Sequence, residues 1–256
     1  MENLTIEPGT IIGIVGKEGA GKSTLVKVLL NRLSATKGKV LVGSTENGRV
    51  EVSSVAPAEF ERHAKTFMQD FVPPEGKSIR QLLELAQTSA PPGGITMEEA
   101  CELTGLYEFL PKRADALDTV LGASWDQGQN FSGGQMKQIG LAMVLVSNPE
   151  VMVLDEPFAN ISSATADTIL AKICEHVQSK NKTLIVISHN YGSFSHADKL
   201  LTIEKGCVTQ YGRPSEIAHQ DGAYLEGILD MVNPALRPLD YQLRYKKGVG
   251  LEMYRV

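Results

Sequence analysis

The chain has 256 residues, 42% of them hydrophobic and 21% charged, and a net charge of −5. This composition is ordinary for a soluble protein with one large or two small domains, and without a dense basic run it argues against a nucleic-acid partner. The widely spaced Cys101, Cys174 and Cys207 form no CxxC pair, which indicates reduced thiols rather than disulfides or a zinc site. Since no apolar run approaches the roughly 20 residues that cross a bilayer, we expect any membrane role to depend on a partner.

Short apolar runs rich in β-branched residues alternate with segments whose apolar residues recur at helical spacing. Strands are predicted at 10–15, 39–42, 49–55, 64–68, 150–157 and 183–188, with a hairpin at 199–212 that turns at Lys205-Gly206. Helices are predicted at 22–33, 78–86, 96–106 with Thr96 as N-cap, after Ser132, and at 162–178. This order indicates an α/β core of the P-loop NTPase type with a mainly parallel sheet, a small antiparallel β subdomain and a helical insertion between its two halves.

The loop that follows the first strand matches the phosphate-binding pattern G-x-x-x-x-G-K-[ST] in the strand-to-helix context that the pattern requires. Its glycines let backbone N–H groups turn toward phosphate oxygens. Lys22 then neutralises the β/γ-phosphates and Ser23 holds Mg²⁺. The expected ATP-binding residues are Gly16, Lys17, Glu18, Gly19, Ala20, Gly21, Lys22, Ser23 and Thr24. Glu18 is unusual there, since a carboxylate opposes anion binding unless it points outward.

Two carboxylates, Asp155 and Glu156, end the apolar strand VMVL. The carboxyl ends of strands are where open α/β sheets bind ligands. Asp155 fits the role of orienting Mg²⁺ through its water shell, and Glu156 fits a general base for the attacking water. The alternative is a pair of solvated carboxylates in a loop, which the following Pro157 and the phosphate loop make the weaker interpretation.

A second glycine-bearing helix start lies far from the first, in FSGGQ at 131–135. The segments GKEGAGKST, FSGGQ, VMVLDEP and VISHN occur in that order, and with them the chain resembles the nucleotide-binding domains of ATP-binding-cassette (ABC) transporters. The resemblance runs from about Leu4 to about Ala218, which predicts an ATP-binding domain at 1–218, with its helical insertion at about 71–146, and an extension at 219–256. The sequences at 110–135 and 186–217 look most like those of the exporter branch of this family.

The resemblance implies roles for residues that would otherwise attract little notice. Two such domains pack head to tail, so Ser132, Gly133, Gly134 and Gln135 would contact in trans the ATP that the partner's phosphate loop holds. Gln69 in FMQD would contact Mg²⁺ and water and link to a membrane partner. His189 in VISHN would contact the γ-phosphate and hold the water with Glu156. Alone, Gln69 would be an unremarkable polar residue and His189 a satisfied core histidine.

The function that this resemblance implies is ATP hydrolysis that drives a membrane exporter from the cytosolic side. The expected partners are a transmembrane domain and a second nucleotide-binding domain. The membrane partner would dock on Gln69 and the helical segment 78–123, with an exposed apolar patch near 70–76. One alternative is a mechanical ATPase that acts on nucleic acid or the ribosome, although such relatives usually carry two cassettes or a coiled-coil insertion. The other is a regulator that binds ATP without turnover, against which Lys22 and Glu156 argue.

The chain departs from the family pattern in three places. Ala159, Asn160, Ile161 and Ser162 replace the usual Ser-Ala-Leu-Asp stretch, so the usual Asp is absent. In the family this loop crosses the dimer interface, and we expect the change to affect communication between the two sites. Met136 and Met143 stand where arginines are usual, through neutral drift or through loss of an exposed or cross-chain contact. Residues 1–21 contain no aromatic residue to stack on adenine. One hypothesis is that the tail folds along the open sheet edge and supplies a tyrosine, from among Tyr241, Tyr245 and Tyr254.

Overall fold

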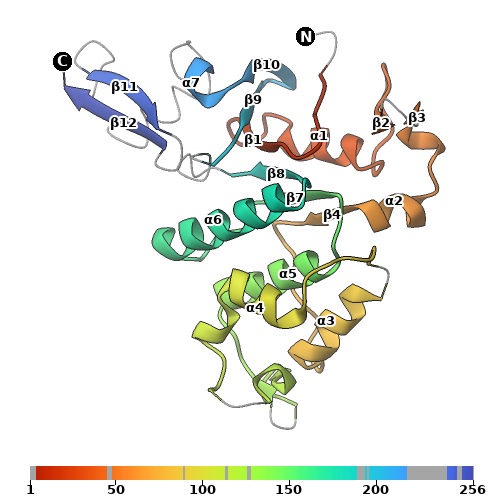
Figure 1. Cartoon of the computed structure of the whole chain (residues 1–256), viewed down its shortest axis with the longest axis vertical. Coiled ribbons are helices and arrows are strands. Elements are labelled where there is room, and N and C mark those ends of the chain that lie inside the picture. The colour runs from red at the N-terminus through yellow and green to blue at the C-terminus, as the bar shows by residue number, and fades with distance from the viewer. Residues whose placement is uncertain are drawn as a thin grey trace. The chain divides into compact units, whose positions relative to one another are not determined.

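The computed structural model describes residues 4–44, 48–88, 90–112, 115–125, 128–188, 194, 196–217, 241–246 and 250–255. The chain forms two compact units. Figure 1 labels the helices and strands. The first unit combines residues 1–60 with 177–256, and the second comprises 61–176. In the part of the chain that is described, no helix has both the length and the apolar character needed to cross a bilayer.

Each unit contains both strands and helices. The first holds β1 (Ile11–Val15), α1 (Lys22–Leu29), β2 (Leu41–Ser44), β3 (Gly48–Glu51), β8 (Thr183–Ile187), β9 (Lys199–Glu204), β10 (Cys207–Gly212), α7 (Pro214–Ile217), β11 (Tyr241–Lys246) and β12 (Gly250–Arg255). The second holds β4 (Ala64–Phe67), α3 (Ile79–Gln87), α4 (Met97–Thr104), β5 (Val120–Leu121), β6 (Gly128–Gln129), α5 (Gly133–Val146) and β7 (Val151–Asp155). Helices α2 (Pro57–His63) and α6 (Ser163–Ser179) each include a boundary between the units.

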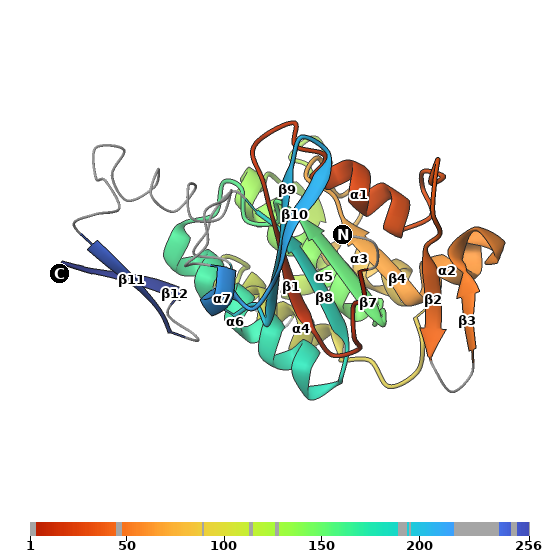
Figure 2. The ribbon, with the colours of Figure 1, turned by 90° about the horizontal axis from the view of Figure 1, so that it is seen from above.

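The first unit is built on strands in the order β10-β9-β1-β8, which Figure 2 shows side by side. Strand β1 runs parallel to both β8 and β9, and β10 returns antiparallel to β9. Every residue of β1 and β8 is buried, as expected for parallel strands that are covered on both faces. Strands β2 and β3 form a separate antiparallel pair. The mainly parallel α/β fold that the sequence predicts, with its small antiparallel sheet, is therefore confirmed.

The turn between β9 and β10 is a two-residue hairpin turn whose second residue is glycine. Lys205 and Gly206 adopt φ angles of 50° and 79°. Two successive positive φ angles match the twist of a two-residue hairpin, and glycine adopts them at little cost. The predicted hairpin at 199–212 is confirmed, with its turn at these two residues.

The second unit packs two helices, α3 and α4, against α5 and pairs β4 with β7 in parallel. The register places Phe67 opposite Leu154, so the two strands end side by side. Helices α3, α4 and α5 each begin with a capping box. In each, the Ser or Thr side chain accepts a hydrogen bond from the backbone N–H three residues on, and the Gln or Glu side chain there accepts one from the N-cap backbone N–H. The predicted N-cap Thr96 is confirmed.

Some element boundaries differ from the sequence prediction. Helix α1 ends at Leu29 rather than near residue 33, and residues 52–54 form a 3₁₀ helix instead of extending the strand. Helix α2 was not predicted, because it buries no side chain and so leaves no apolar periodicity in the sequence.

The C-terminal strands β11 and β12 pair with each other as a separate antiparallel sheet. Among the described residues, the tail therefore does not extend the sheet that contains β1. The part of the tail hypothesis that placed it along the open sheet edge is wrong for the described residues, because β11 and β12 pair with each other in a separate sheet. The side chains of its tyrosines lie outside what the structure describes, so an adenine-stacking role remains a hypothesis.

Candidate functional site

The phosphate loop of the first unit has the backbone of an anion cradle. Gly19 and Gly21 adopt φ angles of 74° and 104°, which favour glycine. Gly21 is the N-cap of α1, and no side-chain hydrogen bond caps this helix start. A helix start that follows a glycine-rich loop is a phosphate site. The residues at Gly16–Thr24 therefore fit a nucleotide phosphate chain.

Close packing against the β9–β10 hairpin holds the phosphate loop in place. A Cβ on Gly16 would meet the carbonyl oxygen of Ile203, so only glycine fits there. The N–H of Gly206 donates to the carbonyl oxygen of Ala20 at 2.9 Å. The β9–β10 hairpin thus braces the loop. Glu18 is exposed, which meets the expectation that its carboxylate points outward.

Lys22 is only 7% exposed and folds back onto the loop. Its Nζ atom donates to the carbonyl oxygens of Gly16 at 2.7 Å and Lys17 at 3.1 Å. These contacts hold the ammonium group inside the phosphate loop, where it can bind an anion. Ser23 and Thr24 follow with exposed side chains, so the Ser23 hydroxyl is accessible to a metal ion.

In the second unit, the two predicted carboxylates lie at the end of β7. Asp155 is the last residue of the strand and 8% exposed, and Glu156 follows it with a φ angle of 47°. A positive φ is uncommon for a residue other than glycine and marks stored backbone strain. A strained backbone at Glu156, beside the buried Asp155, is what we expect where the surrounding structure fixes the orientation of a catalytic carboxylate.

The loop that carries Gln69, called the glutamine loop from here on, begins at the end of the neighbouring strand β4. Gln69 lies two residues beyond Phe67, and its side chain is exposed. Glu156 lies two residues beyond Leu154, the partner of Phe67. The register therefore brings these two predicted catalytic residues to equivalent positions past adjacent strand ends.

Lys137, which the sequence reasoning passed over, contacts both of these segments. Its Nζ atom donates to the carbonyl oxygen of Gln69 at 3.1 Å and to that of Glu156 at 3.0 Å. Burial lowers the pKa of Lys137, and the carboxylates of Glu156, Asp70 and Asp155 oppose this shift. The only signal in the sequence was a lysine within the apolar run of a helix.

The segment FSGGQ at 131–135, called the signature segment from here on, includes the N-cap and the first residues of α5. The Ser132 hydroxyl accepts a hydrogen bond from the N–H of Gln135 at 3.2 Å, and the Gln135 side chain accepts one from the N–H of Ser132 at 2.8 Å. Ser132 and Gly133 are exposed, whereas Gly134 is buried. The exposed part of this helix start is available to a ligand from outside the unit. Met136 and Met143 are half-buried further along the helix.

The divergent loop at 159–162 packs on the signature segment. A Cβ on Gly134 would lie 2.5 Å from the carbonyl oxygen of Asn160 and 3.2 Å from Cγ1 of Ile161. Ser162, at the position of the missing Asp, accepts a hydrogen bond from the N–H of Thr165 at 3.3 Å. Serine is a favoured N-cap, and this contact places Ser162 as the cap at the start of α6.

His189 lies outside the described residues. The phosphate loop belongs to the first unit, and Gln69, Asp155, Glu156 and the signature segment belong to the second. Within the second unit, the structure brings Gln69 and Glu156 together through Lys137.

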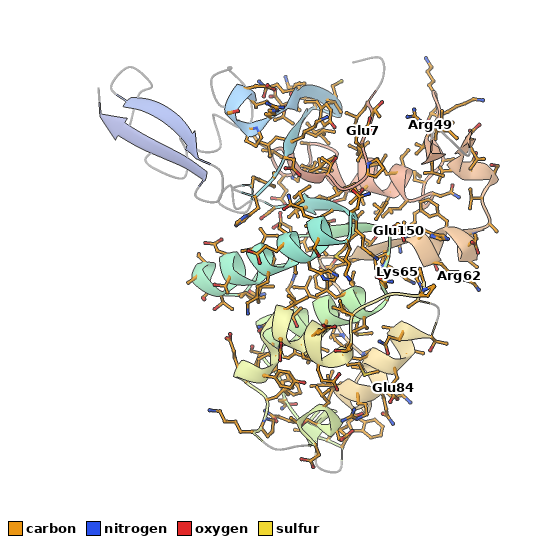
Figure 3. All side chains as sticks on the ribbon, viewed as in Figure 1. Glu7, Arg49, Arg62, Lys65, Glu84 and Glu150 are labelled. Atoms are coloured by element: carbon orange, nitrogen blue, oxygen red, sulfur yellow. The ribbon has the colours of Figure 1, made fainter. Side chains whose placement is uncertain are left out.

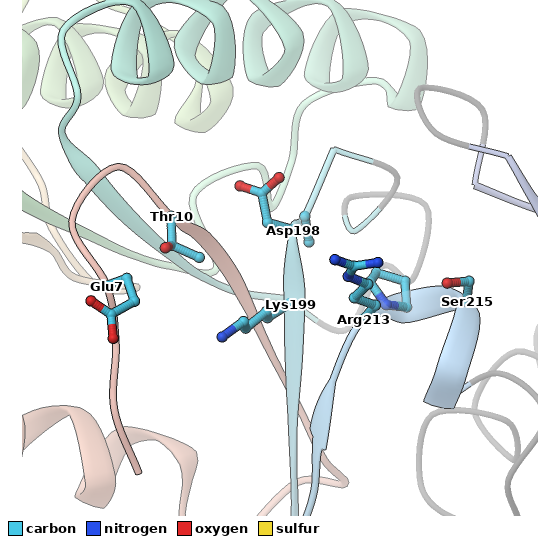
Figure 4. Close-up of a pocket in the computed structure, with 8 residues that line it drawn as sticks. Glu7, Thr10, Asp198, Lys199, Arg213 and Ser215 are labelled. Atoms are coloured by element: carbon cyan, nitrogen blue, oxygen red, sulfur yellow. The ribbon is translucent and has the colours of Figure 1, made fainter.

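A cavity of about 450 Å³ lies at the other end of β1 from the phosphate loop (Figure 4). Its lining includes Glu7 and Thr10 before β1, Asp198 and Lys199 at the start of β9, and Arg213 after β10. The carboxylate of Asp198 accepts a hydrogen bond from the N–H of Ile11 at 3.0 Å. The five residues of β1 separate this cavity from the phosphate loop by roughly 16 Å. It is not part of the nucleotide cradle, and its two acidic and two basic residues balance in charge.

Comparison with known proteins places this fold and these motifs in one family. The sequence profile described as ABC transporter matches residues 2–159, and the chain belongs to this family. It is 31% identical over 223 residues to the toxin RTX-I translocation ATP-binding protein of Actinobacillus pleuropneumoniae, covering 87% of this chain and 30% of that protein. It is 29% identical over 218 residues to the alpha-hemolysin translocation ATP-binding protein HlyB of Escherichia coli, covering 84% of this chain and 29% of that protein.

A solved structure has the same fold. A bacterial Atm1-family ABC exporter with ATP bound superimposes with a TM-score of 0.75 at 22% identity, covering 88% of this chain and 37% of the exporter chain. The chain thus spans less than a third of the length of the two relatives named above.

Proposed function

We propose that the chain is an ATP-binding and ATP-hydrolysing subunit or domain that powers a membrane exporter. The observation that carries this proposal is the presence of two glycine-bearing helix starts in one chain, before α1 and before α5. One rigid domain cannot approach a γ-phosphate from opposite sides. The second helix start therefore serves the nucleotide of a neighbouring domain. In this proposal residues 1–218 form the ATP-binding domain, with its helical insertion at about 71–146, and 219–256 form an extension.

Binding begins at the phosphate loop in this mechanism. The N–H groups at the start of α1 receive phosphate oxygens, and Lys22 turns from the loop carbonyls toward the β/γ-phosphates. Ser23 would hold Mg²⁺ directly, Asp155 through water, and Gln69 as a further contact. Bound Mg²⁺ supplies the positive charge that neutralises the phosphate oxygens during transfer.

Hydrolysis then needs a base and a water molecule in line with the γ-phosphate. The carboxylate of Glu156 accepts a proton from the water, and the water oxygen forms a bond to the γ-phosphorus. The bond from that phosphorus to the bridging oxygen breaks, and ADP leaves with the electron pair. His189 would contact the γ-phosphate and hold the same water.

The membrane partner would dock on the second unit. Val72 is 65% exposed and Trp125 is 53% exposed, and the Trp125 ring packs beside Gly76 in the same loop region. Leu85 is 65% exposed on α3, next to Glu84, which Figure 3 labels. A contiguous apolar patch marks an interaction surface, and in this proposal these side chains contribute to one that receives a helix from a transmembrane domain. The chain would then lie on the cytosolic side of the membrane, held there by this partner.

Phosphate release by the purified chain, measured at several protein concentrations with Mg²⁺, tests this function. The specific activity should rise with protein concentration, because two chains complete each site. ATP binding without phosphate release at any concentration would favour a regulator that does not hydrolyse ATP. Recovery of the chain with ribosomes or nucleic acid instead of membranes would favour a mechanical ATPase.

A further inference from the structure

Lys137 is a buried cation that the proposed reaction does not use. It is 7% exposed and lies in α5, whose other residues are mostly apolar and buried. A buried ammonium group costs free energy unless it is paired or hydrogen-bonded. For packing alone, an apolar side chain of the same length would serve as well or better. The contacts of Lys137 therefore need another explanation.

Its contacts join two loops that carry catalytic side chains. The Nζ atom donates to the carbonyl oxygens of Gln69 and Glu156, at 3.1 and 3.0 Å, and lies 5.7 Å from the centroid of the Phe67 ring. Because Phe67 pairs with Leu154, these carbonyls follow adjacent strand ends at equivalent positions. One ammonium group thus fixes the distance between the two loops.

The carbonyl of Glu156 belongs to a residue in a strained conformation. With a φ angle of 47°, this peptide would relax if nothing held it. A hydrogen bond from a charged donor is roughly twice as strong as a neutral one. Lys137 is therefore placed to hold the backbone from which the Glu156 carboxylate projects.

The helix that carries Lys137 also carries the signature segment. Gly133 and Lys137 are four residues apart, so they lie one turn apart on the same side of α5. Any shift of the helix start would move the ammonium group and, with it, both carbonyls. This gives a direct physical path from the signature segment to the two catalytic loops.

We propose that Lys137 is a positioning residue. It links the backbone of the glutamine loop and the backbone of Glu156 to helix α5 and so keeps the two loops in fixed positions relative to this helix. This proposal rests on the proposed ATP hydrolysis, in which Glu156 acts on the water. In this role Lys137 acts through the two loops rather than on the nucleotide or the water. Its loss should leave nucleotide binding intact and slow the chemical step.

The kinetic test compares Lys137→Met with Lys137→Arg. Lys137→Met should lower kcat about tenfold or more while KM for ATP changes less than about twofold, because the loss acts on the transition state. Lys137→Arg, which retains charged donors, should recover a large part of kcat. The matched control is Lys172→Met, since Lys172 also donates to a main-chain carbonyl in this unit, that of Glu102 at 3.4 Å. A wild-type kcat in Lys137→Met would overturn the proposal.

Hydrogen exchange of the nucleotide-free chain tests the same contacts without catalysis. In Lys137→Met, amides at 68–72 and 156–160 should exchange about tenfold faster than in the wild type, whereas Lys172→Met should match the wild type. If Lys137→Met does not fold, Lys137→Gln replaces it, because the shorter amide cannot hold both carbonyls. Unchanged exchange in both loops would overturn the proposal. A wild-type chain without phosphate release would instead refute the proposed hydrolysis and leave this measurement decisive for Lys137.

Discussion

At the residue scale, backbone conformation and burial decide which side chains can act. Glu156 has a positive φ, whereas Asp155 before it ends a regular buried strand. This change of backbone direction turns two consecutive carboxylates to different surroundings. A metal-orienting group and a base can therefore occupy neighbouring positions without sharing one environment.

Replacing Glu156 by Gln should separate binding from turnover. The amide retains the shape of the side chain but cannot accept the proton, so hydrolysis should fall by roughly 100-fold or more. ATP that is bound but not cleaved should then stabilise the dimer. Size-exclusion chromatography with ATP measures this, and Lys22→Ala is the control that should not dimerise. A Glu156→Gln chain that stays monomeric at high protein and ATP concentrations would contradict the dimer mechanism.

The cysteines should differ sharply in reactivity. Cys101 and Cys174 are buried, and Cys207 is exposed. Burial raises the pKa of Cys101 from 9.0 to about 12, so at pH 8 this thiol stays protonated and unreactive. A thiol reagent at pH 8 should modify a single thiol of the native chain quickly, and Cys207→Ser should abolish that phase. Unfolding in denaturant should expose the other two. Rapid modification of two thiols in the native chain would contradict this assignment.

The residues of the site could be predicted from the sequence where a motif fixes both residue type and spacing. Gly16, Lys22 and Asp155 are of this kind, because phosphate and magnesium chemistry demands those groups in that order. Lys137 could not be predicted, because its role depends on the pairing of β4 with β7. That pairing links positions far apart in the chain and leaves no local pattern.

At the element scale, the start of α5 combines exposed residues on one side with a close backbone contact on the other. In the proposed function its exposed residues receive a ligand, while Gly134 lets the backbone of Asn160 approach closely. Elements with a buried apolar face, such as α5 and β8, were evident from the sequence. Helix α2 was not, since nothing on it is buried, and only tertiary context determines such a segment.

Adding one methyl group should distinguish the two glycines of the signature segment. In Gly134→Ala, the new Cβ would lie 2.5 Å from the carbonyl oxygen of Asn160, so the loop or the helix must shift, at a cost of about 1–3 kcal/mol. In Gly133→Ala, the nearest atom is Nδ2 of Asn160 at 3.7 Å, an ordinary contact. Denaturant unfolding should show a lower stability for Gly134→Ala only. Equal losses would mean that the divergent loop does not constrain the signature segment.

At the scale of the whole molecule, the phosphate loop and the signature segment belong to different units of one chain. In the proposed dimer, each catalytic site takes its phosphate loop from one chain and its signature segment from the other. Ser132 is exposed at its helix start. An arginine at this position would occupy the space intended for the partner's phosphate without disturbing the phosphate loop of its own chain.

Mixing two inactive variants should therefore restore activity. Ser132→Arg alone should bind ATP and not hydrolyse it, and Lys22→Ala alone should bind ATP poorly. In a mixed dimer, one site joins an intact phosphate loop to an intact signature segment, and the other site carries both defects. If the chains pair at random, half the dimers are mixed and each has one working site, so the mixture should regain about a quarter of wild-type phosphate release. A mixture that stays inactive, although each variant is folded and Ser132→Arg binds ATP, would mean that both helix starts serve a nucleotide bound to the same chain.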